Sequence, residues 1–234
     1  MLKKIAIVVM ILTVCISMVA CSSDGKKHME LKNAQDTILN LDSGKITVIS
    51  QFEGENKSDT IKSEFVFKTN PGGVLSYCQT QYDLNNKTVY CEYSDGEKSE
   101  QWLVGRGWSV LDTTQYSKDN PHRYAKLLAT SFDKKSIDSI ICDETETEKT
   151  YTMELDPKVL NKTTYKDTEI EIISQSVTML VNAKNELVRY NDTSKVLDKS
   201  TDTQSLYMLE MALSEQNAIK EVVRPELRDY LPNK

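Results

Sequence analysis

The chain has 234 residues, and its 29 basic and 35 acidic side chains give a net charge of −6 at pH 7. This length suits one domain with a substantial core. An acidic chain without a basic block is a poor candidate for binding nucleic acid, so we exclude that class of partner. With two histidines and no Cys-x-x-Cys pair, the sequence also predicts no metal site and no cofactor.

The first residues have the pattern of a secretory signal, because Lys3 and Lys4 precede an apolar run that ends at Ala20. The run is shorter than the ~20 residues of a membrane-spanning helix, so we expect residues 1–20 to be removed. Ordinary secretion with cleavage nearby and an uncleaved N-terminal anchor are the alternatives.

The end of this segment, Met18-Val19-Ala20-Cys21, resembles the lipobox of bacterial lipoproteins. The resemblance implies that Cys21 carries acyl chains such as palmitate and becomes the new N-terminus. Two acyl chains hold a protein stably on a bilayer. We therefore expect a lipid anchor on the outer, extracytoplasmic face of the cell membrane.

Residues 21–28 are polar and small and predict a flexible tether, with a single domain over residues 29–234. Met29–Leu41 has helical spacing, and its apolar stripe of Leu31, Ala34, Ile38 and Leu41 should lie against a sheet. Gly44 follows as a plausible C-terminal cap.

From Lys45 onward the apolar period changes to two, which predicts half-buried antiparallel strands. The expected strands of the first half are 45–52, 61–68, 74–82, 87–93, 97–104 and 108–111. A helix is expected after Asn120, with Pro121 at its first position.

The second half predicts further strands at 137–142, 150–155, 169–181 and 186–191, with a loop or short helix at 159–167. The polar stretch Asp192–Thr203 reads as a loop. Ser205–Ser214 fits helix by composition and strand by alternation, and we favour the strand. Val222–Pro225 should be extended, and Pro225–Leu231 is expected to form a closing helical turn.

Cys78 and Cys91 are symmetric about the Leu84–Asn85 junction of a predicted hairpin. A two-residue loop would place them directly opposite each other, within reach of a disulfide. The alternative is that both are free thiols. If the disulfide forms, Cys142 is the odd buried thiol.

No nucleophile–base motif occurs in the sequence, so we expect no enzymatic activity and no catalytic residues. His122 and the acidic run 143–146 are best explained as solvated groups. Trp102 and Trp108 flank the Gly105-Arg106-Gly107 turn, and they either line a cleft or pack in the core.

The order of elements resembles the lipoprotein-carrier superfamily, which includes the mycobacterial lipid-carrying lipoproteins and uncharacterised Gram-positive relatives. The segments that carry the resemblance are Ala34–Phe52, Tyr90–Leu111 with Asp95-Gly96 and Gly107-Trp108, and Val222–Leu231. It implies an α+β fold, in which a strongly curved antiparallel sheet forms an open half-barrel around a few helices on its concave face.

The resemblance also implies a function, which is carriage or sensing of a hydrophobic ligand, a lipid or an acylated molecule, in a cleft of the sheet. The alternative is a non-enzymatic module that binds another envelope protein or assists envelope assembly on the cell surface.

Overall fold

The computed structural model describes residues 24–38, 40–55, 57–111, 134–166 and 168–228. The predicted signal, Cys21 and the predicted helix that contains His122 lie outside these ranges.

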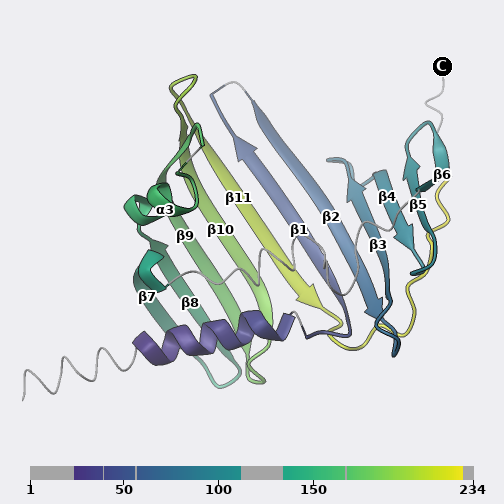
Figure 1. Cartoon of the computed structure of the whole chain (residues 1–234), viewed down its shortest axis with the longest axis horizontal. Helices are drawn as coiled ribbons and strands as arrows, with labels where there is room; N and C mark the ends of the chain where they lie inside the picture. The colour runs from purple at the N-terminus through teal and green to yellow at the C-terminus, as the bar shows by residue number, and fades with distance from the viewer. Residues whose placement is uncertain (1–23, 39, 56, 112–133, 167, 229–234) are drawn as a thin grey trace, which may run out of the picture.

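Eleven strands form one open, antiparallel sheet (Figure 1), which fits the expected curved sheet. The strands are β1 (Ser43–Glu53), β2 (Ser58–Thr69), β3 (Leu75–Tyr82), β4 (Thr88–Ser94), β5 (Ser99–Leu103), β6 (Gly107–Leu111), β7 (Ile137–Glu144), β8 (Glu148–Leu155), β9 (Ile170–Asn182), β10 (Leu187–Asp198) and β11 (Thr203–Ser214). Their order is β6-β5-β4-β3-β2-β1-β11-β10-β9-β8-β7. Each half of the chain is therefore a meander, and pairing of β1 with β11 joins the two halves.

A helix over residues 24–38 crosses the sheet near one end (Figure 1). Its Leu31, Ala34 and Ile38 are buried in the main core, which confirms the predicted apolar stripe. The helix begins inside the predicted tether. Its first turn is supported by an ion pair of 3.3 Å between Lys27 and Asp24.

The expected cap at Gly44 is wrong, because Gly44 lies within β1. A Cβ atom at this position would lie 3.3 Å from the ring of Phe67, so the glycine allows close packing there. The helix is instead followed by a tight turn, in which the amide of Leu41 donates to the carbonyl of Ile38.

Side chains alternate between two faces of the sheet, and we call the face that contacts the helix 24–38 the inner face. The main core lies on this face and includes Ile46, Phe65, Tyr77 and Met211. A second, smaller cluster lies on the outer face and contains Cys78, Cys91, Trp102 and Val222. Cys78 follows inward-facing Tyr77 directly in β3, so the two clusters lie on opposite faces.

The C-terminal segment 219–228 crosses the outer face of β3 to β6 without regular secondary structure (Figure 1). Arg224 donates to Glu100 at 2.7 Å and lies 3.9 Å from the ring centre of Trp108. Lys68 donates to the carbonyl of Lys220. The expected helical turn is wrong for residues 225–228, because these residues form no helix and the amide of Leu227 donates to the carbonyl of Pro225 instead.

Two short helical pieces complete the described elements, η1 (Lys134–Ser136) and α3 (Pro157–Thr163). Asp156 caps α3 by accepting from the amide of Lys158 at 2.8 Å. Residues 159–167 were expected to form a loop or a short helix, and the structure has a helix as far as Thr163.

Strand β11 confirms the preferred interpretation of Ser205–Ser214, since Met211 and Leu213 point into the core at a spacing of two. The predicted loop at Asp192–Thr203 is wrong as far as Asp198. This stretch continues β10, because its backbone pairs with both β9 and β11. A central position in a sheet supplies backbone partners on both sides, so the polar side chains do not prevent a strand.

Candidate functional site

The described helices cover the inner face of the sheet unequally. The helix 24–38 buries its lower part in Figure 1, and α3 packs beside β9, where Asn161 exchanges two hydrogen bonds with the backbone of Ile172. At the other end of the central strands, Ile61 is 47% exposed and Tyr207 is 46% exposed. These two side chains lie on the same face as the core, because they are an even number of residues from Phe65 and Met211.

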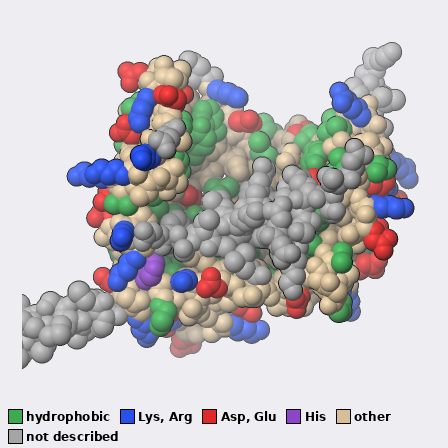
Figure 2. All heavy atoms as spheres, in the orientation of Figure 1, with side chains coloured by type: hydrophobic (Ala, Val, Ile, Leu, Met, Phe, Trp, Pro, Cys, Tyr) green, Lys and Arg blue, Asp and Glu red, His purple; other side chains and the backbone are tan. Residues whose placement is uncertain are grey.

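A hollow of about 180 Å³ opens in this less covered region. Its lining residues come from β1, β10 and β11, and they are Ser50, Gln51, Asp192, Ser194, Tyr207, Met208 and Leu209. Phe52 lies beside it, with its ring 4.9 Å from that of Tyr207. Figure 2 shows this face hollowed, with hydrophobic side chains visible in the recess.

The strand register divides the hollow into a polar and an apolar side. Asp192 and Ser194 of β10 lie opposite Leu209 and Tyr207 of β11. Tyr207 in turn lies opposite Phe52 of β1. The β10 side therefore presents a carboxylate and a hydroxyl, and the β11 and β1 side presents hydrocarbon.

Asp192 is the centre of the polar side. Its Oδ1 accepts from the hydroxyl of Ser194 at 2.9 Å. Its Oδ2 accepts from the amide of Gln175 at 2.8 Å and from the hydroxyl of Tyr190 at 3.4 Å. Burial raises the pKa of Asp192, and these three hydrogen bonds oppose that rise.

Among the described residues that line the hollow, Asp192 is the one charged group. The basic residues of β10, Arg189 and Lys195, have odd numbers and so point to the outer face, where Arg189 pairs with Glu210 at 3.8 Å. Asp192 was not predicted as a site residue, because its polar surroundings in the sequence indicated a loop. Alternation with Tyr190 and Val196 was the signal that could have shown its direction.

Cys78 and Cys91 are not directly opposite each other, so the predicted register is wrong. Cys78 pairs with Tyr93 and Cys91 pairs with Thr80. The loop is longer than two residues, because the amide of Asp83 donates to the carbonyl of Lys87. A further one-residue shift follows beyond Gln81.

The two cysteines are instead diagonal neighbours on the outer face. Their Sγ atoms lie 3.6 Å apart, and both are buried free thiols. Cys142 is a partly buried free thiol in β7. The disulfide between Cys78 and Cys91 stays a prediction.

Trp102 and Trp108 face each other across the β5–β6 pair. Trp102 is buried in the second cluster, and Trp108 packs against that cluster from its edge. They therefore take the packing role that was the alternative to lining a cleft. The hollow lies on the other face of the sheet.

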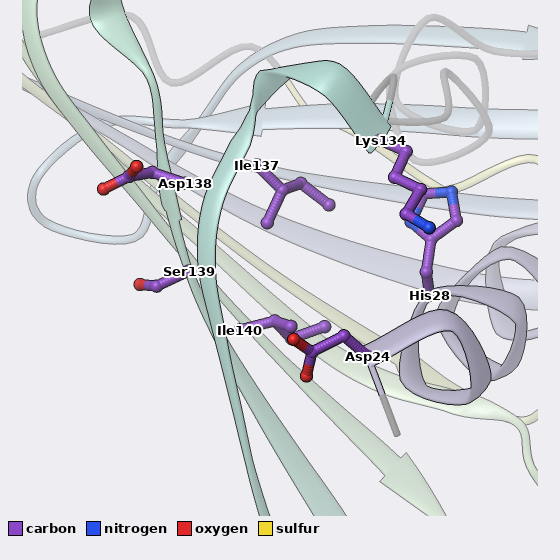
Figure 3. A pocket seen from close by; sticks show the side chains of 7 residues that line it. All are labelled: Asp24, His28, Lys134, Ile137, Asp138, Ser139 and Ile140. Carbon is purple, nitrogen blue, oxygen red and sulfur yellow. The ribbon is translucent and has the colours of Figure 1, made fainter. Parts of the chain in front are cut away.

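A second pocket, of about 140 Å³, lies between the start of the helix 24–38 and β7. Figure 3 shows His28 beside Lys134, while Asp138 and Ser139 point away from them on the other side of the strand. Among the described residues, no group of three or more His, Cys, Asp or Glu side chains could hold a metal ion. The mixed charges of this pocket form no arrangement of nucleophile and base.

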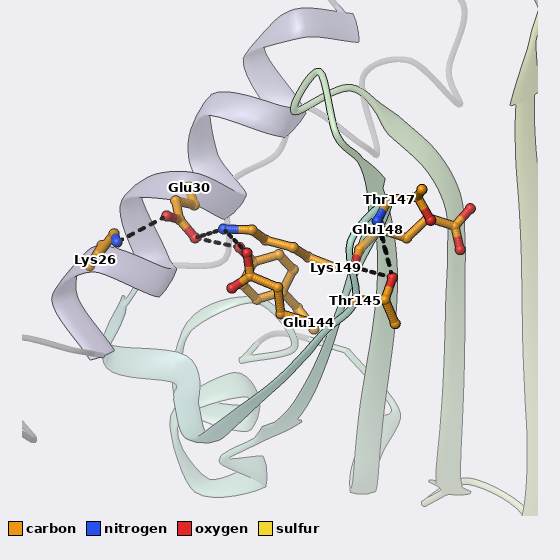
Figure 4. A network of polar contacts seen from close by, with 8 residues as sticks. Lys26, Glu30, Glu144, Thr145, Thr147, Glu148 and Lys149 are labelled. Atoms are coloured by element: carbon orange, nitrogen blue, oxygen red, sulfur yellow. Dashed lines mark hydrogen bonds and ion pairs between the residues drawn. The ribbon is translucent and has the colours of Figure 1, made fainter.

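Polar contacts fasten the helix 24–38 to the β7–β8 hairpin (Figure 4). Tyr151 donates to Glu30 at 2.5 Å, and Lys149 pairs with Glu30 at 3.6 Å and with Glu144 at 3.4 Å. The hydrogen bond from Tyr151, more than any other contact, holds the pKa of Glu30 below its usual value. The acidic stretch at Glu144 thus has a structural contact rather than being only solvated.

Within the described ranges, no helix has the length and apolar character needed to cross a membrane.

No protein-family model matches the sequence, and no curated protein matches it significantly. Among solved structures, the chain is similar to the lipoprotein LprF of Mycobacterium bovis, with 12% identity and a TM-score of 0.47 over 86% of this chain and 97% of that one. It is similar to the lipoprotein LppX of Mycobacterium tuberculosis, with 13% identity and a TM-score of 0.46 over 86% of this chain and all of that one.

A more distant likeness is to a domain of an outer membrane lipoprotein-sorting protein from Vibrio parahaemolyticus, with 10% identity and a TM-score of 0.26 over 81% of this chain and 91% of that one. LprF and LppX are mycobacterial lipoproteins, the group of proteins that the order of elements in the sequence resembles.

Proposed function

We propose that this protein is a non-enzymatic lipoprotein, anchored through acyl chains on Cys21 to the extracytoplasmic face of the cell membrane, that binds a hydrophobic ligand. The ligand, a lipid or an acylated molecule, lies in the hollow on the inner face of the sheet. The observation that carries this proposal is the exposure of Ile61 and Tyr207 on the same face that forms the main core.

Such exposure is costly for a free protein and useful for one that binds hydrocarbon. Apolar surface gains roughly 25 cal/mol for each Å² removed from water, or about 0.8 kcal/mol for each methylene group buried. A ligand chain laid along Phe52, Tyr207 and Leu209 would be stabilised in this way. Concave, largely apolar sites with a few polar groups are typical of small-molecule binding.

The test compares two variants of adjacent residues. Ser194→Trp fills the hollow, and Thr193→Trp places the same side chain on the outer face of the same strand. The full chain is purified from membranes in a mild detergent, and native mass spectrometry measures the lipid that remains bound.

We expect wild type and Thr193→Trp to carry lipid and Ser194→Trp to carry much less. Absence of bound lipid from wild type, even after incubation with a lipid extract, would contradict the proposal. A thermal melt checks that Ser194→Trp is folded. If it is not, Leu209→Ser is the second variant, because it removes hydrocarbon from the lining without adding volume.

A second candidate is a module that binds another envelope protein through the edges of the sheet. Among the described strands, β6 and β7 lie at the edges of the sheet, and their side chains Val110 (71%) and Ile141 (59%) are exposed. The edge of a sheet can pair with a further strand. Val110→Lys or Ile141→Lys would abolish such a contact and leave lipid occupancy unchanged. Cross-linking in intact cells, followed by identification of the partner, distinguishes this candidate from the first.

A further inference from the structure

Among the described residues that line the hollow, Asp192 is the one charged side chain, and the others are apolar or uncharged. We propose that the hollow selects an amphiphile whose head group donates hydrogen bonds to Asp192, a hydroxyl or an ammonium, and excludes phosphate or carboxylate head groups. This inference rests on the proposed function and names the class of ligand for the same site.

Asp192 has hydrogen-bond acceptor capacity that the protein does not use. An ionised carboxylate offers about four acceptor positions. Gln175, Tyr190 and Ser194 occupy three of them. A donor on the ligand can therefore bind without displacing a protein group.

The negative charge of Asp192 also distinguishes among head groups. A negative head group beside Asp192 would be repelled, and the repulsion is strong because burial keeps water away from the carboxylate. The basic residues of the same strand, Arg189 and Lys195, point to the outer face. Of the described residues in the lining, none supplies the positive charge that usually binds a phosphate.

The division of the hollow into a polar and an apolar side suits an amphiphile. The polar β10 side lies directly across from Leu209 and Tyr207, so an amphiphile can place its head on one side and its hydrocarbon on the other. The Phe52–Tyr207 ring pair extends the apolar side toward β1. A ligand with no polar group would leave part of the hydrogen-bonding capacity of Asp192 unsatisfied and desolvated.

Three probes with the same chain test the selection, namely hexadecylglycerol, hexadecylamine and hexadecyl phosphate. The full chain is incubated with an equimolar mixture of the three in a non-ionic detergent, which competes equally in each case. Native mass spectrometry then counts the protein molecules that carry each probe.

The matched variants are Asp192→Asn and Glu210→Gln. Both remove one carboxylate from neighbouring central strands, but Glu210 lies on the outer face and pairs with Arg189. Thermal melts confirm that both are folded. The comparison among probes on wild type tests the proposal even where Asp192→Asn does not fold.

We expect wild type and Glu210→Gln to carry hexadecylglycerol or hexadecylamine at least about tenfold more often than hexadecyl phosphate. In Asp192→Asn, the phosphate should come within about threefold of the glycerol probe, since the repelling charge is gone. A preference for the amine that disappears in Asp192→Asn identifies an ion pair. A preference for the glycerol probe in wild type identifies neutral hydrogen bonding.

Binding of all three probes to wild type with equal frequency, or best binding of the phosphate, overturns this inference and leaves the proposed function standing. Selection that is the same in wild type and a folded Asp192→Asn overturns it as well, because the cause would then lie elsewhere. Failure of every probe to bind is a failure of the proposed function itself.

Discussion

Asp192 is the residue on which the polar side of the hollow depends. It receives hydrogen bonds from β9 through Gln175 and from its own strand through Tyr190 and Ser194. Burial nevertheless dominates and raises the pKa of its carboxyl. Without ligand, the ionised form is therefore less stable in the folded protein than in the unfolded chain.

This shift gives the free energy of unfolding a dependence on pH. Because the folded pKa of Asp192 lies above the ordinary value of 3.8, the folded state binds its proton more tightly. The contribution of Asp192 is thus most favourable below that value and is lost as the pH rises through the raised pKa. Asp192→Asn has no titrating carboxyl proton at this position, so its free energy of unfolding lacks this dependence on pH.

We expect the stability of wild type minus that of Asp192→Asn to fall as the pH rises from about 4 to neutrality. Urea unfolding at a series of pH values measures this difference, and other titrating groups cancel because both proteins contain them. A difference that grows with pH would show that the hydrogen bonds outweigh burial.

The anchor is a prediction about one residue, Cys21, and it rests on the lipobox resemblance. Cys21→Ala should release the protein from membranes or stall its processing, because the acylated thiol is missing. Membrane fractionation and intact mass measure the result, with Cys142→Ala as the control that keeps the anchor. Processing and membrane attachment of Cys21→Ala equal to those of wild type would refute the lipoprotein assignment.

The β3–β4 hairpin brings two thiols together on the outer face. Diagonal neighbours on one face of a sheet come within reach of each other, and the Sγ atoms of Cys78 and Cys91 are 3.6 Å apart. An exported protein meets an oxidising environment, so we expect a disulfide after a modest side-chain adjustment. It should stabilise the fold by about 2–3 kcal/mol.

Counting thiols on the unfolded, unreduced protein tests this bridge. One free thiol, that of Cys142, is the expected result when Cys21 is acylated. Three free thiols would show that Cys78 and Cys91 remain reduced. Unfolding of wild type and Cys78→Ser with and without reductant separates the effect of the bond from that of packing, since reductant should lower the stability of wild type only when the wild type is oxidised.

The C-terminal segment 219–228 is the element that covers those thiols. Val222 is 7% exposed and packs on the second cluster, whereas its neighbour Val223 is 70% exposed. Val222→Ala should cost about 1–2 kcal/mol of unfolding free energy, because it leaves a cavity over Cys78 and Trp102. Val223→Ala should cost little.

Chemical denaturation measures both variants, and the rate of thiol labelling in the reduced protein provides a second measurement. Faster labelling of Cys78 in Val222→Ala but not in Val223→Ala is expected. Equal stability of the two variants would mean that the C-terminal segment does not hold the cluster closed.

The whole sheet depends on the pairing of β1 with β11, which joins the first half of the chain to the last strand. This pairing runs from Lys45 opposite Ser214 to Glu53 opposite Leu206. Its neighbours on both sides carry most of the main core. The short edge strand β6, by contrast, has one strand partner among the described residues.

Hydrogen exchange should follow this arrangement. Amides of β11 and β10 should exchange slowly, near the rate of global unfolding, because their strands are central and buried. Amides of β6 should exchange much faster. Exchange measured by mass spectrometry at peptide resolution checks the order, and rapid exchange in β11 would show that the two halves do not form one cooperative unit.

Local sequence patterns predicted most elements of the sheet, because period-two alternation directly reports which side of a strand is buried. Ser205–Ser214 is the clearest case, since alternation indicated a strand where composition favoured a helix. The strand was missed at Asp192–Asp198, because inward Asp192 and Ser194 are polar and Val196 is the one apolar side chain that continues the alternation there. No local signal there indicates that strands lie on both sides.

The sequence indicated a class of ligand but not the residues of the candidate site. A hydrophobic ligand was expected from the resemblance, but the tryptophans named as lining lie on the outer face, and Asp192 was overlooked. The hollow is built from β1, β10 and β11, so its β1 residues are separated from the others by more than a hundred positions along the chain. Their meeting depends on strand order, which spacing within one strand does not contain.

The sequence by itself thus determined the periodicities, turns and apolar stripe, and it carries the resemblance to a lipobox, because each depends on residues that are neighbours in the chain. Only the tertiary structure decided the pairing of β1 with β11, the offset of Cys78 and Cys91, and the direction of Asp192. These follow from backbone hydrogen bonding and side-chain packing between distant segments. Which strand pairs with which is set by the free energy of the whole sheet rather than by any one stretch.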